Sequence, residues 1–236
     1  MTYCVGMTLN EGIIMAADTR TNAGVDQIAT FPKLFTFENT GERVVMLTTS
    51  GNLATSQRVI SILKQQIARK EETNIFACDS LFQIADLVGQ TLVSTQKLYR
   101  EENEDRKVDF NANFILGGQI RGQAQAVYRI YPEGNFIRAT PDTPFFQIGE
   151  SKYGKPILDR IITPETPLNQ AMKCSLISFD STMKSNLSVG MPIDLAIYRT
   201  DSLEIKIERL LPDDRYFNKL AKAWGEGLKH LFHQLP

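Results

Sequence analysis

The stretch MTYCVGMTLNEGIIMAAD, residues 1–18, decides the fold of this chain. It contains two short apolar runs of strand length, Tyr3 to Thr8 and Ile13 to Ala17, separated by the turn signal Asn10-Glu11-Gly12. The second run looks fully buried and ends at Asp18. The chain therefore starts with a predicted strand hairpin, and Thr2 lies directly in front of its first strand.

Outward from this hairpin, the sequence alternates between strand and helix patterns. Leu34 to Glu38 and Arg43 to Thr49 flank a second turn signal, which predicts another hairpin. Apolar residues at helical spacing then predict helices over Leu53 to Arg69 and Ser80 to Arg100, the latter with Ser80 as its N-cap. The later elements follow in chain order: strands within residues 111–148, helices over Lys152 to Ile162 and Leu168 to Lys184, a hairpin over Ile193 to Leu210 and a last helix over Asp213 to Phe232.

The order of these elements indicates the architecture. Strands come in antiparallel groups, helices come in pairs, and no Pro-, Gly- or Ser-rich linker or internal repeat interrupts them. Such a pattern favours two packed sheets with helices outside. We therefore expect one α/β domain over residues 1–236, a four-layer αββα sandwich of two antiparallel sheets flanked by helices. The charged segment 101–107 is expected to be a solvated loop.

Composition narrows the class of function. Lys and Arg number 26 and Asp and Glu 27, so the net charge of −1 gives no reason to expect nucleic acid or an anionic membrane as a partner. Cys4, Cys78 and Cys174 are scattered, which favours a reducing compartment over disulfides or a structural zinc site. Because the sequence has no long apolar run and no signal-peptide pattern, we expect the protein in the cytoplasm.

Thr2 is a candidate nucleophile because of its position behind Met1. A small second residue lets methionine aminopeptidase remove Met1, which would give Thr2 a free α-amine. Such an amine has an ordinary pKa of about 7.7–8.0, so it can act as the base that activates the threonine hydroxyl. The simpler alternative is that Thr2 is only a permissive second residue. Taken alone, its position favours this alternative, because nothing in the local sequence demands catalysis.

Asp18 and Lys33 strengthen the catalytic interpretation. Lys33 lies between apolar residues in FPKLF, so its ammonium group must reach solvent or be paired. Asp18, at the end of its apolar strand, is the natural partner, and a buried pair of this kind would stay ionised. If Lys33 also faced Thr2, its charge would favour the alkoxide and lower the pKa of the amine. The alternative is a salt bridge of purely structural use.

Several motifs resemble the proteasome beta-subunit family. The opening threonine, AADTRT at the end of the second strand, FPKLF and TTSGNLA occur in the family's order. The motifs MTYCVGM, ADTRTNAG, GESKYGKPILDR and SVGMPIDL are similar more specifically to the bacterial Anbu, or ancestral beta-subunit, branch of that family. The resemblance covers essentially the whole chain and implies the Ntn-hydrolase fold, the fold of hydrolases with an N-terminal nucleophile.

The resemblance also assigns roles to four residues. It implies Thr2 as the nucleophile, Asp18 as the catalytic aspartate, and Gly51 as the glycine whose backbone N–H holds the oxyanion. It implies Lys33 as the catalytic lysine, although the interval from Thr2 to Lys33 is one residue shorter than is usual in the family. A one-residue deletion in the intervening loop would explain that difference.

The supporting polar residues match the family less well. The family's serine in this region corresponds to Glu150 without a gap and to Ser151 with a one-residue shift, and we prefer Ser151. A further aspartate and serine, three residues apart, correspond to Ser185 and Ser188. Ser185 thus replaces an aspartate that supports the terminal amine in the family, and the efficiency of catalysis depends on that support.

The resemblance implies a threonine peptidase or amidase that acts on peptides or related amides without a metal or organic cofactor. It also implies self-association into a ring or an open spiral, while no motif identifies an unfoldase partner. A catalytically weak or inactive assembly subunit of the same fold is the alternative. The short N-terminus argues against a self-cleaved propeptide and leaves removal of Met1 as the expected maturation step. His230 and His233, on one face of the predicted last helix, lack the further ligands that a metal would need.

Overall fold

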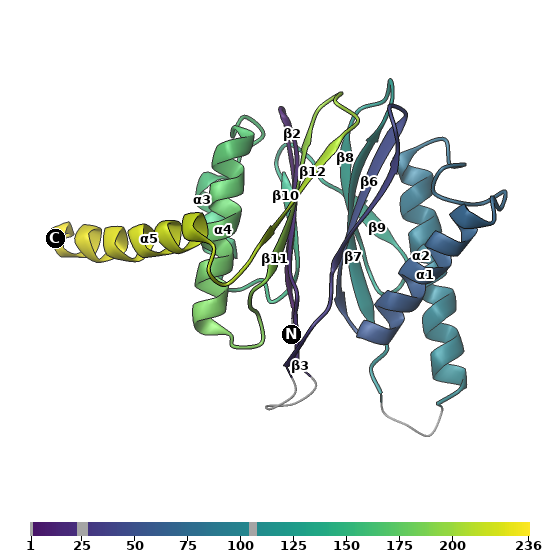
Figure 1. Cartoon of the computed structure of the whole chain (residues 1–236), viewed down its shortest axis with the longest axis horizontal. Helices are drawn as coiled ribbons and strands as arrows, with labels where there is room; N and C mark the ends of the chain where they lie inside the picture. The colour runs from purple at the N-terminus through teal and green to yellow at the C-terminus, as the bar shows by residue number, and fades with distance from the viewer. Residues whose placement is uncertain (1, 23–27, 104–107) are drawn as a thin grey trace.

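Two antiparallel sheets stacked face to face form the centre of the computed structural model, which describes residues 2–22, 28–103 and 108–236. Helices cover the outer faces of both sheets (Figure 1). The first sheet has the order β10-β1-β2-β11-β12, formed by Phe145–Gly149, Tyr3–Leu9, Gly12–Asp18, Ile193–Arg199 and Ile205–Leu210. The second has the order β5-β6-β7-β8-β9, formed by Leu34–Asn39, Arg43–Gly51, Ala112–Ile120, Ala126–Ile130 and Phe136–Arg138. The predicted four-layer αββα sandwich is confirmed.

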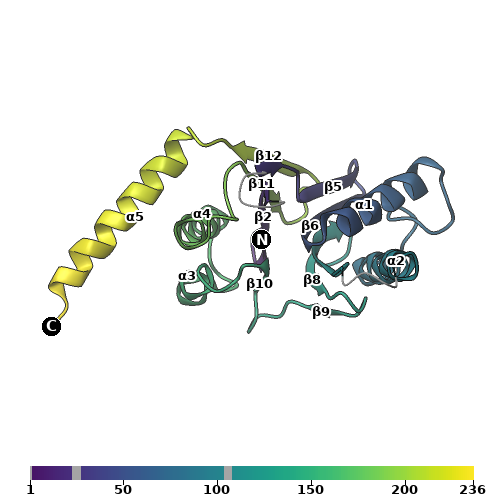
Figure 2. The same cartoon turned by 90° about the horizontal axis from the view of Figure 1, so that it is seen from below.

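Two pairs of helices form the outer layers, and a fifth helix leaves the body of the molecule (Figures 1 and 2). Their bounds are Leu53–Ala68 for α1, Leu81–Glu101 for α2, Lys155–Ile161 for α3, Leu168–Ser185 for α4 and Arg215–Gln234 for α5. The Ser80 side chain accepts a hydrogen bond from the backbone N of Gln83 at 3.2 Å, which confirms Ser80 as the N-cap of α2. Within the described ranges, no helix is long and apolar enough to cross a membrane.

Apolar side chains fill three layers, one between the sheets and one under each helix pair. β6 shows how a single strand serves two of these layers. Val44 and Met46 point into the layer between the sheets, whereas Val45 and Leu47 point into the layer under α1 and α2. Because both faces of the strand are buried, its sequence is apolar at successive positions instead of alternating. β1 and β2 are buried on both faces in the same way, so the opening hairpin lies in the middle of the molecule.

The structure departs from the sequence prediction at several element boundaries. Two short strands, β3 at Arg20–Asn22 and β4 at Ile28–Thr30, form a separate sheet. The sequence did not predict them, because a strand of three residues is too short to show an alternating pattern. α3 starts at Lys155, not at Lys152, because the preceding residues form a turn that ends at Gly154. Residue 101 of the predicted charged loop ends α2, while residues 104–107 of that loop lie outside the described residues. Met1 lies outside them as well.

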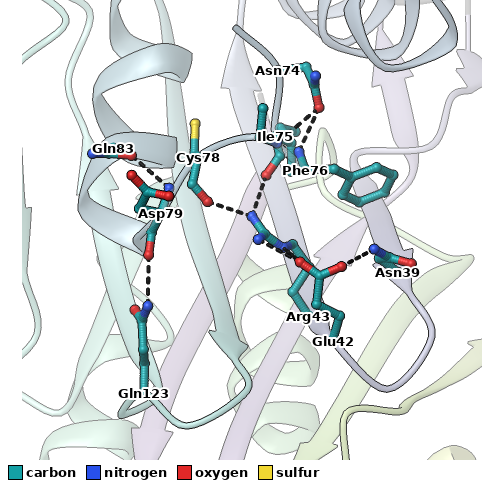
Figure 3. Close-up of polar contacts among 11 residues, drawn as sticks. Asn39, Glu42, Arg43, Asn74, Ile75, Phe76, Cys78, Asp79, Gln83 and Gln123 are labelled. Atoms are coloured by element: carbon teal, nitrogen blue, oxygen red, sulfur yellow. Dashed lines mark hydrogen bonds and ion pairs between the residues drawn. The ribbon is translucent and has the colours of Figure 1, made fainter. Parts of the chain in front are cut away.

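Arg43, at the start of β6, connects the second sheet to the segment between α1 and α2 (Figure 3). Its buried guanidinium group donates hydrogen bonds to the carbonyl oxygens of Ile75 and Cys78 at 3.0 and 2.6 Å. The same group forms an ion pair with Glu42 at 2.7 Å. These contacts satisfy carbonyl groups that the loop would otherwise bury without partners. They hold the helix pair in a fixed position above the sheet that carries Gly51.

Candidate active site

The candidate site lies at the edge of the sandwich where three strands of the first sheet bring their ends together. Tyr3, the first residue of β1, pairs with Gly149, the last residue of β10, and β2 ends beside them at Asp18. A pocket of about 400 Å³ opens between this edge and the end of β6. Thr2, Lys33 and Gly51 all line it, so the structure brings three of the sequence-predicted residues into one pocket.

Thr2 is held by backbone contacts on the strand β10 side. Its carbonyl oxygen accepts a hydrogen bond from the backbone N–H of Glu150 at 2.7 Å. Gly149 adopts a φ of +82°, and a Cβ atom at this position would lie 2.0 Å from the Thr2 carbonyl oxygen. Only glycine, which has no Cβ atom, leaves room for the Thr2 carbonyl group so close to the backbone. The hydrogen bond from Glu150 can therefore hold Thr2 at the pocket wall.

Asp18 and Lys33 form a buried ion pair beneath the pocket. The Lys33 Nζ atom lies 2.8 Å from Asp18 Oδ1 and also donates a hydrogen bond to the Arg20 carbonyl oxygen at 2.5 Å. The Asp18 carboxylate accepts two backbone hydrogen bonds, from Tyr3 N at 3.0 Å and from Gly190 N at 3.3 Å. Burial raises the pKa of Asp18, and the Lys33 ammonium and the two N–H groups act in the opposite direction. Asp18 therefore links Lys33 directly to the peptide that follows Thr2.

Gly51 lies on the opposite wall of the pocket, at the junction of β6 and α1. Its φ is +99°, and a Cβ atom here would come within 2.4 Å of the Asn111 carbonyl oxygen. The next residue, Asn52, is the N-cap of α1, so the pocket wall coincides with the N-terminal end of a helix dipole. Peptide N–H groups and a positive dipole end favour a negative charge, which makes this wall suitable for an oxyanion.

The three supporting serines do not line the pocket. Ser151 follows Glu150 in the turn before α3, Ser185 is the exposed last residue of α4, and Ser188 lies in the segment after that helix. Within the described ranges, their hydroxyl groups make no hydrogen bonds.

Glu150 and Asn186 occupy the region in which the sequence analysis placed those serines. Glu150 is 7% exposed, and its carboxylate accepts hydrogen bonds from the Asn186 side-chain amide at 3.0 Å and from Lys152 N at 3.3 Å. The Asn186 Oδ1 atom in turn accepts a bond from Ser188 N at 2.9 Å. This chain of contacts ties the end of β10, and with it Thr2, to the segment after α4. Glu150, the ungapped alternative to Ser151, thus has the nearer contact with Thr2.

Two further pocket residues escaped the sequence analysis. Thr21 Oγ1 and Arg129 Nε are buried atoms that have no hydrogen-bond partner among the described residues, and both residues line the pocket. Arg129 had a detectable signal, because it is the one charged residue in the otherwise apolar run from Ala126 to Ile130. Thr21 had none, since an exposed-looking threonine after a strand is common. Buried polar atoms of this kind are rare in folded proteins and often mark sites for a ligand.

Other reactive residues do not form a second centre. Cys4 is fully buried and donates a weak hydrogen bond to the Thr49 carbonyl oxygen at 3.4 Å, and burial raises the pKa of its thiol. His230 and His233 lie on α5, which projects away from the two sheets (Figure 1). The described part of the chain holds no group of three or more His, Cys, Asp or Glu residues that could bind a metal ion.

Known proteins resemble this chain in both sequence and overall fold. The family model of the proteasome subunit matches residues 2–198. Anbu (ancestral beta-subunit) from Yersinia bercovieri is 49% identical, with 99% of this chain and 97% of that chain covered and a TM-score of 0.93. The helical assembly of the Anbu complex from Pseudomonas aeruginosa also shows 49% identity, 99% and 97% coverage and a TM-score of 0.93. An Anbu (Gly-1) mutant from Hyphomicrobium sp. strain MC1 is 46% identical, with 100% and 98% coverage and a TM-score of 0.92. The search of the curated proteins gave no match.

Proposed function

Because the chain belongs to the proteasome subunit family, we propose that it is a threonine-type peptidase or amidase whose nucleophile is Thr2, exposed by removal of Met1. One observation supports this proposal above the others. Thr2, Lys33 and Gly51 line a single pocket, and the buried Asp18 carboxylate holds Lys33 at 2.8 Å beneath it. A nucleophile, a fixed cation and an anion-stabilising wall are the parts that hydrolysis of an amide needs.

The first half of the reaction forms an acyl-enzyme. The neutral α-amine of Thr2, acting through a water molecule, removes the proton from Oγ while Oγ attacks the carbonyl carbon of the amide. The Gly51 N–H stabilises the oxyanion that develops, and the Lys33 charge favours the negative charge on Oγ. The protonated amine then donates its proton to the leaving nitrogen. The C–N bond breaks, the amine product leaves, and an ester to Thr2 Oγ remains.

The second half of the reaction returns the enzyme to its starting state. A water molecule loses a proton to the Thr2 amine as its oxygen attacks the ester carbonyl. The intermediate collapses with release of the carboxylic acid product, and the proton returns to Oγ. Asp18 takes no proton in this scheme, because its role is to position Lys33 and the peptide N–H of Tyr3.

Assembly with further copies of the same chain is the second part of the proposal. α5 carries apolar residues along one side, of which Leu228, Leu231 and Phe232 are 48%, 54% and 72% exposed. An apolar side of this length on a projecting helix is typical of a contact surface. The relative from Pseudomonas aeruginosa forms a helical assembly, which supports the open spiral that the family resemblance implies.

An assembly subunit with weak or no activity is the competing function. The observation in its favour is that Ser151, Ser185 and Ser188 lie outside the pocket, so the polar support of the amine differs from the pattern that the sequence comparison implied. Fold alone does not distinguish an active hydrolase from an inactive assembly subunit. A covalent reaction at Thr2 distinguishes them, because only the hydrolase has an activated hydroxyl there.

Covalent labelling of Thr2 tests the proposed activity. Protein that begins at Thr2 is incubated with a β-lactone probe, and the modified residue is located by peptide mapping. We expect one adduct, on Thr2 Oγ, because only this hydroxyl has an adjacent amine as base. Thr8→Ala, a substitution on the same strand but away from the pocket, serves as the matched control for Thr2→Ala. Absence of an adduct on folded, fully processed protein would favour the assembly-subunit alternative.

A further inference from the structure

Arg129 is a cation at the pocket for which the proposed mechanism has no use. It lies on β8, where Val127 belongs to the apolar layer between the sheets. Side chains two residues apart on a strand share a face, so Arg129 continues that layer toward the edge that carries Thr2. There it lines the same pocket as Thr2 and Lys33. Arg129 is half-buried, and its buried Nε atom needs a hydrogen-bond acceptor.

The described part of the chain supplies no such partner. Arg129 forms no ion pair there, and its buried Nε atom has no hydrogen-bond acceptor. The residues that line the pocket include two cations, Lys33 and Arg129, but no carboxylate. The buried Asp18 carboxylate compensates the charge of Lys33, whose Nζ atom lies 2.8 Å from Asp18 Oδ1. The remaining positive charge of the pocket therefore belongs to Arg129.

The surroundings of Arg129 orient its guanidinium group. The Arg129 Cζ atom lies 4.8 Å from the centroid of the Tyr131 ring, so the ring covers one side of the cation. Asn113, on the neighbouring strand β7, contributes a neutral amide to the same pocket, and Ser50 pairs with Asn113 across β6 and β7. A guanidinium fork with neutral hydrogen-bonding neighbours suits a carboxylate, which accepts two parallel N–H bonds.

We propose that Arg129 is a specificity residue that binds a substrate carboxylate in the pocket beside Thr2. The substrate class is then peptides, or related amides, that carry a negative charge close to the scissile bond. That charge belongs either to an acidic side chain or to a free C-terminal carboxylate, since both present the same chemistry to the guanidinium group. This inference rests on the proposed function, because it takes the bond beside Thr2 as the one that is cleaved.

Matched peptide pairs test the inference and separate the two sources of the carboxylate. One series moves a single Glu through the positions on both sides of the cleaved bond, with Gln at the same position as the neutral partner. The second series compares a free C-terminal carboxylate with the C-terminal amide. For the wild-type chain, we expect kcat/KM for the charged member of one series to exceed that of its neutral partner by about 10- to 100-fold, the usual effect of a charged hydrogen bond.

Substitution of Arg129 provides the decisive comparison. Arg129→Met should bring the charged-to-neutral ratio of kcat/KM close to 1, and Arg129→Lys should restore part of the preference because it keeps the charge without the fork. Arg121→Met, at an exposed turn residue, is the matched control and should keep the wild-type ratio. A wild-type ratio near 1 in both series, or a preference that persists in Arg129→Met, would overturn the inference. Thermal unfolding of both Arg129 variants establishes that the substituted chains are folded.

A binding measurement distinguishes failure of this inference from failure of the proposed function. Isothermal titration calorimetry with the same Glu and Gln peptides detects carboxylate binding without hydrolysis. If the β-lactone leaves Thr2 unmodified but the Glu peptide binds at least about tenfold more tightly and loses this advantage in Arg129→Met, the carboxylate site stands and the proposed hydrolysis fails. If Thr2 is modified but neither peptide series shows a charge preference, the hydrolysis stands and the carboxylate site fails.

Discussion

At the scale of single residues, the buried ion pair of Asp18 and Lys33 is the feature on which the proposed chemistry depends. Taking two charges out of water is unfavourable, and the pair persists because Asp18 also accepts backbone hydrogen bonds from Tyr3 and Gly190. Apolar packing alone would serve stability as well as this pair does. Its location under the pocket gives Lys33 a fixed charge close to Thr2, which a purely structural pair would not need.

Replacement of Lys33 should abolish the chemistry at Thr2. We expect Lys33→Ala to lower the rate of β-lactone labelling by at least about 100-fold, as removal of a charge-stabilising group does in other hydrolases. It should also destabilise the fold, by up to about 3–5 kcal/mol at neutral pH, because Asp18 is left buried without its cation. Labelling kinetics and chemical denaturation measure the two effects.

Two matched variants separate the loss of chemistry from the loss of stability. Lys33→Ala combined with Asp18→Asn removes both buried charges and should recover most of the stability without recovering the labelling. Lys155→Ala, which breaks an exposed pair with Asp159, should leave both properties close to wild type. Wild-type labelling rates in folded Lys33→Ala would remove Lys33 from the mechanism.

Burial of Cys174 predicts how stability changes at alkaline pH. Burial raises the pKa of this thiol from 9.0 to about 12, so the native chain keeps a proton that the unfolded chain loses between these values. The native state then binds more protons, and the free energy of unfolding falls as pH rises above about 9. We expect Cys174→Ala to reduce this pH dependence between pH 8 and pH 10.5, measured by chemical denaturation. An unchanged slope in the variant would show that Cys174 is not its source.

At the scale of secondary-structure elements, the junction of β6 and α1 decides the shape of the pocket wall that we propose holds the oxyanion. Gly51→Ala should destabilise the protein and reduce labelling of Thr2 together, because the new Cβ would lie 2.4 Å from a carbonyl oxygen at a φ of +99°. Gly122 also has a positive φ, at +77°, but a Cβ there meets nothing within 4 Å. Gly122→Ala therefore isolates the backbone strain, about 1–2 kcal/mol, and should leave labelling unchanged. Equal effects of the two substitutions on labelling would contradict the assigned role of this junction.

The sequence predicted elements well where their signals are local. The spacing of apolar residues indicated α1 and α2, and the hydroxyl of Ser80 marked the start of α2, because capping and amphipathic packing act within a few residues. β3 and β4 were missed, since segments of three residues carry no periodicity. The Asp18–Lys33 pairing was foreseen from an isolated lysine between apolar neighbours. Glu150 was considered only as the alternative to Ser151, and the motif alone could not show that its backbone N–H bonds to the Thr2 carbonyl oxygen. Arg129 was not assigned to the site, because its place in the pocket arises from strand register across the fold, which no short motif encodes.

At the scale of the whole molecule, α5 offers a test of self-association. Its first turns pack against the body through the buried Phe217, while Leu228 and Phe232 remain exposed on the projecting part (Figures 1 and 2). We expect Leu228→Glu combined with Phe232→Glu to convert the proposed oligomer into smaller species, measured by analytical ultracentrifugation. Lys219→Glu, on the opposite side of the helix, is the control and should leave the assembly intact. An unchanged sedimentation profile in the double variant would place the contact surface elsewhere.

The proposed chemistry depends on one condition, a free amine on Thr2. Intact-mass spectrometry of protein purified from its native host, before and after incubation with an epoxyketone probe, tests this condition most directly. An epoxyketone reacts with both the hydroxyl and the amine of an N-terminal threonine. We expect the mass of a chain that begins at Thr2, and then the mass of a single added probe, which peptide mapping assigns to Thr2. A chain that retains Met1, or a processed chain that gains no probe, would contradict the proposed chemistry.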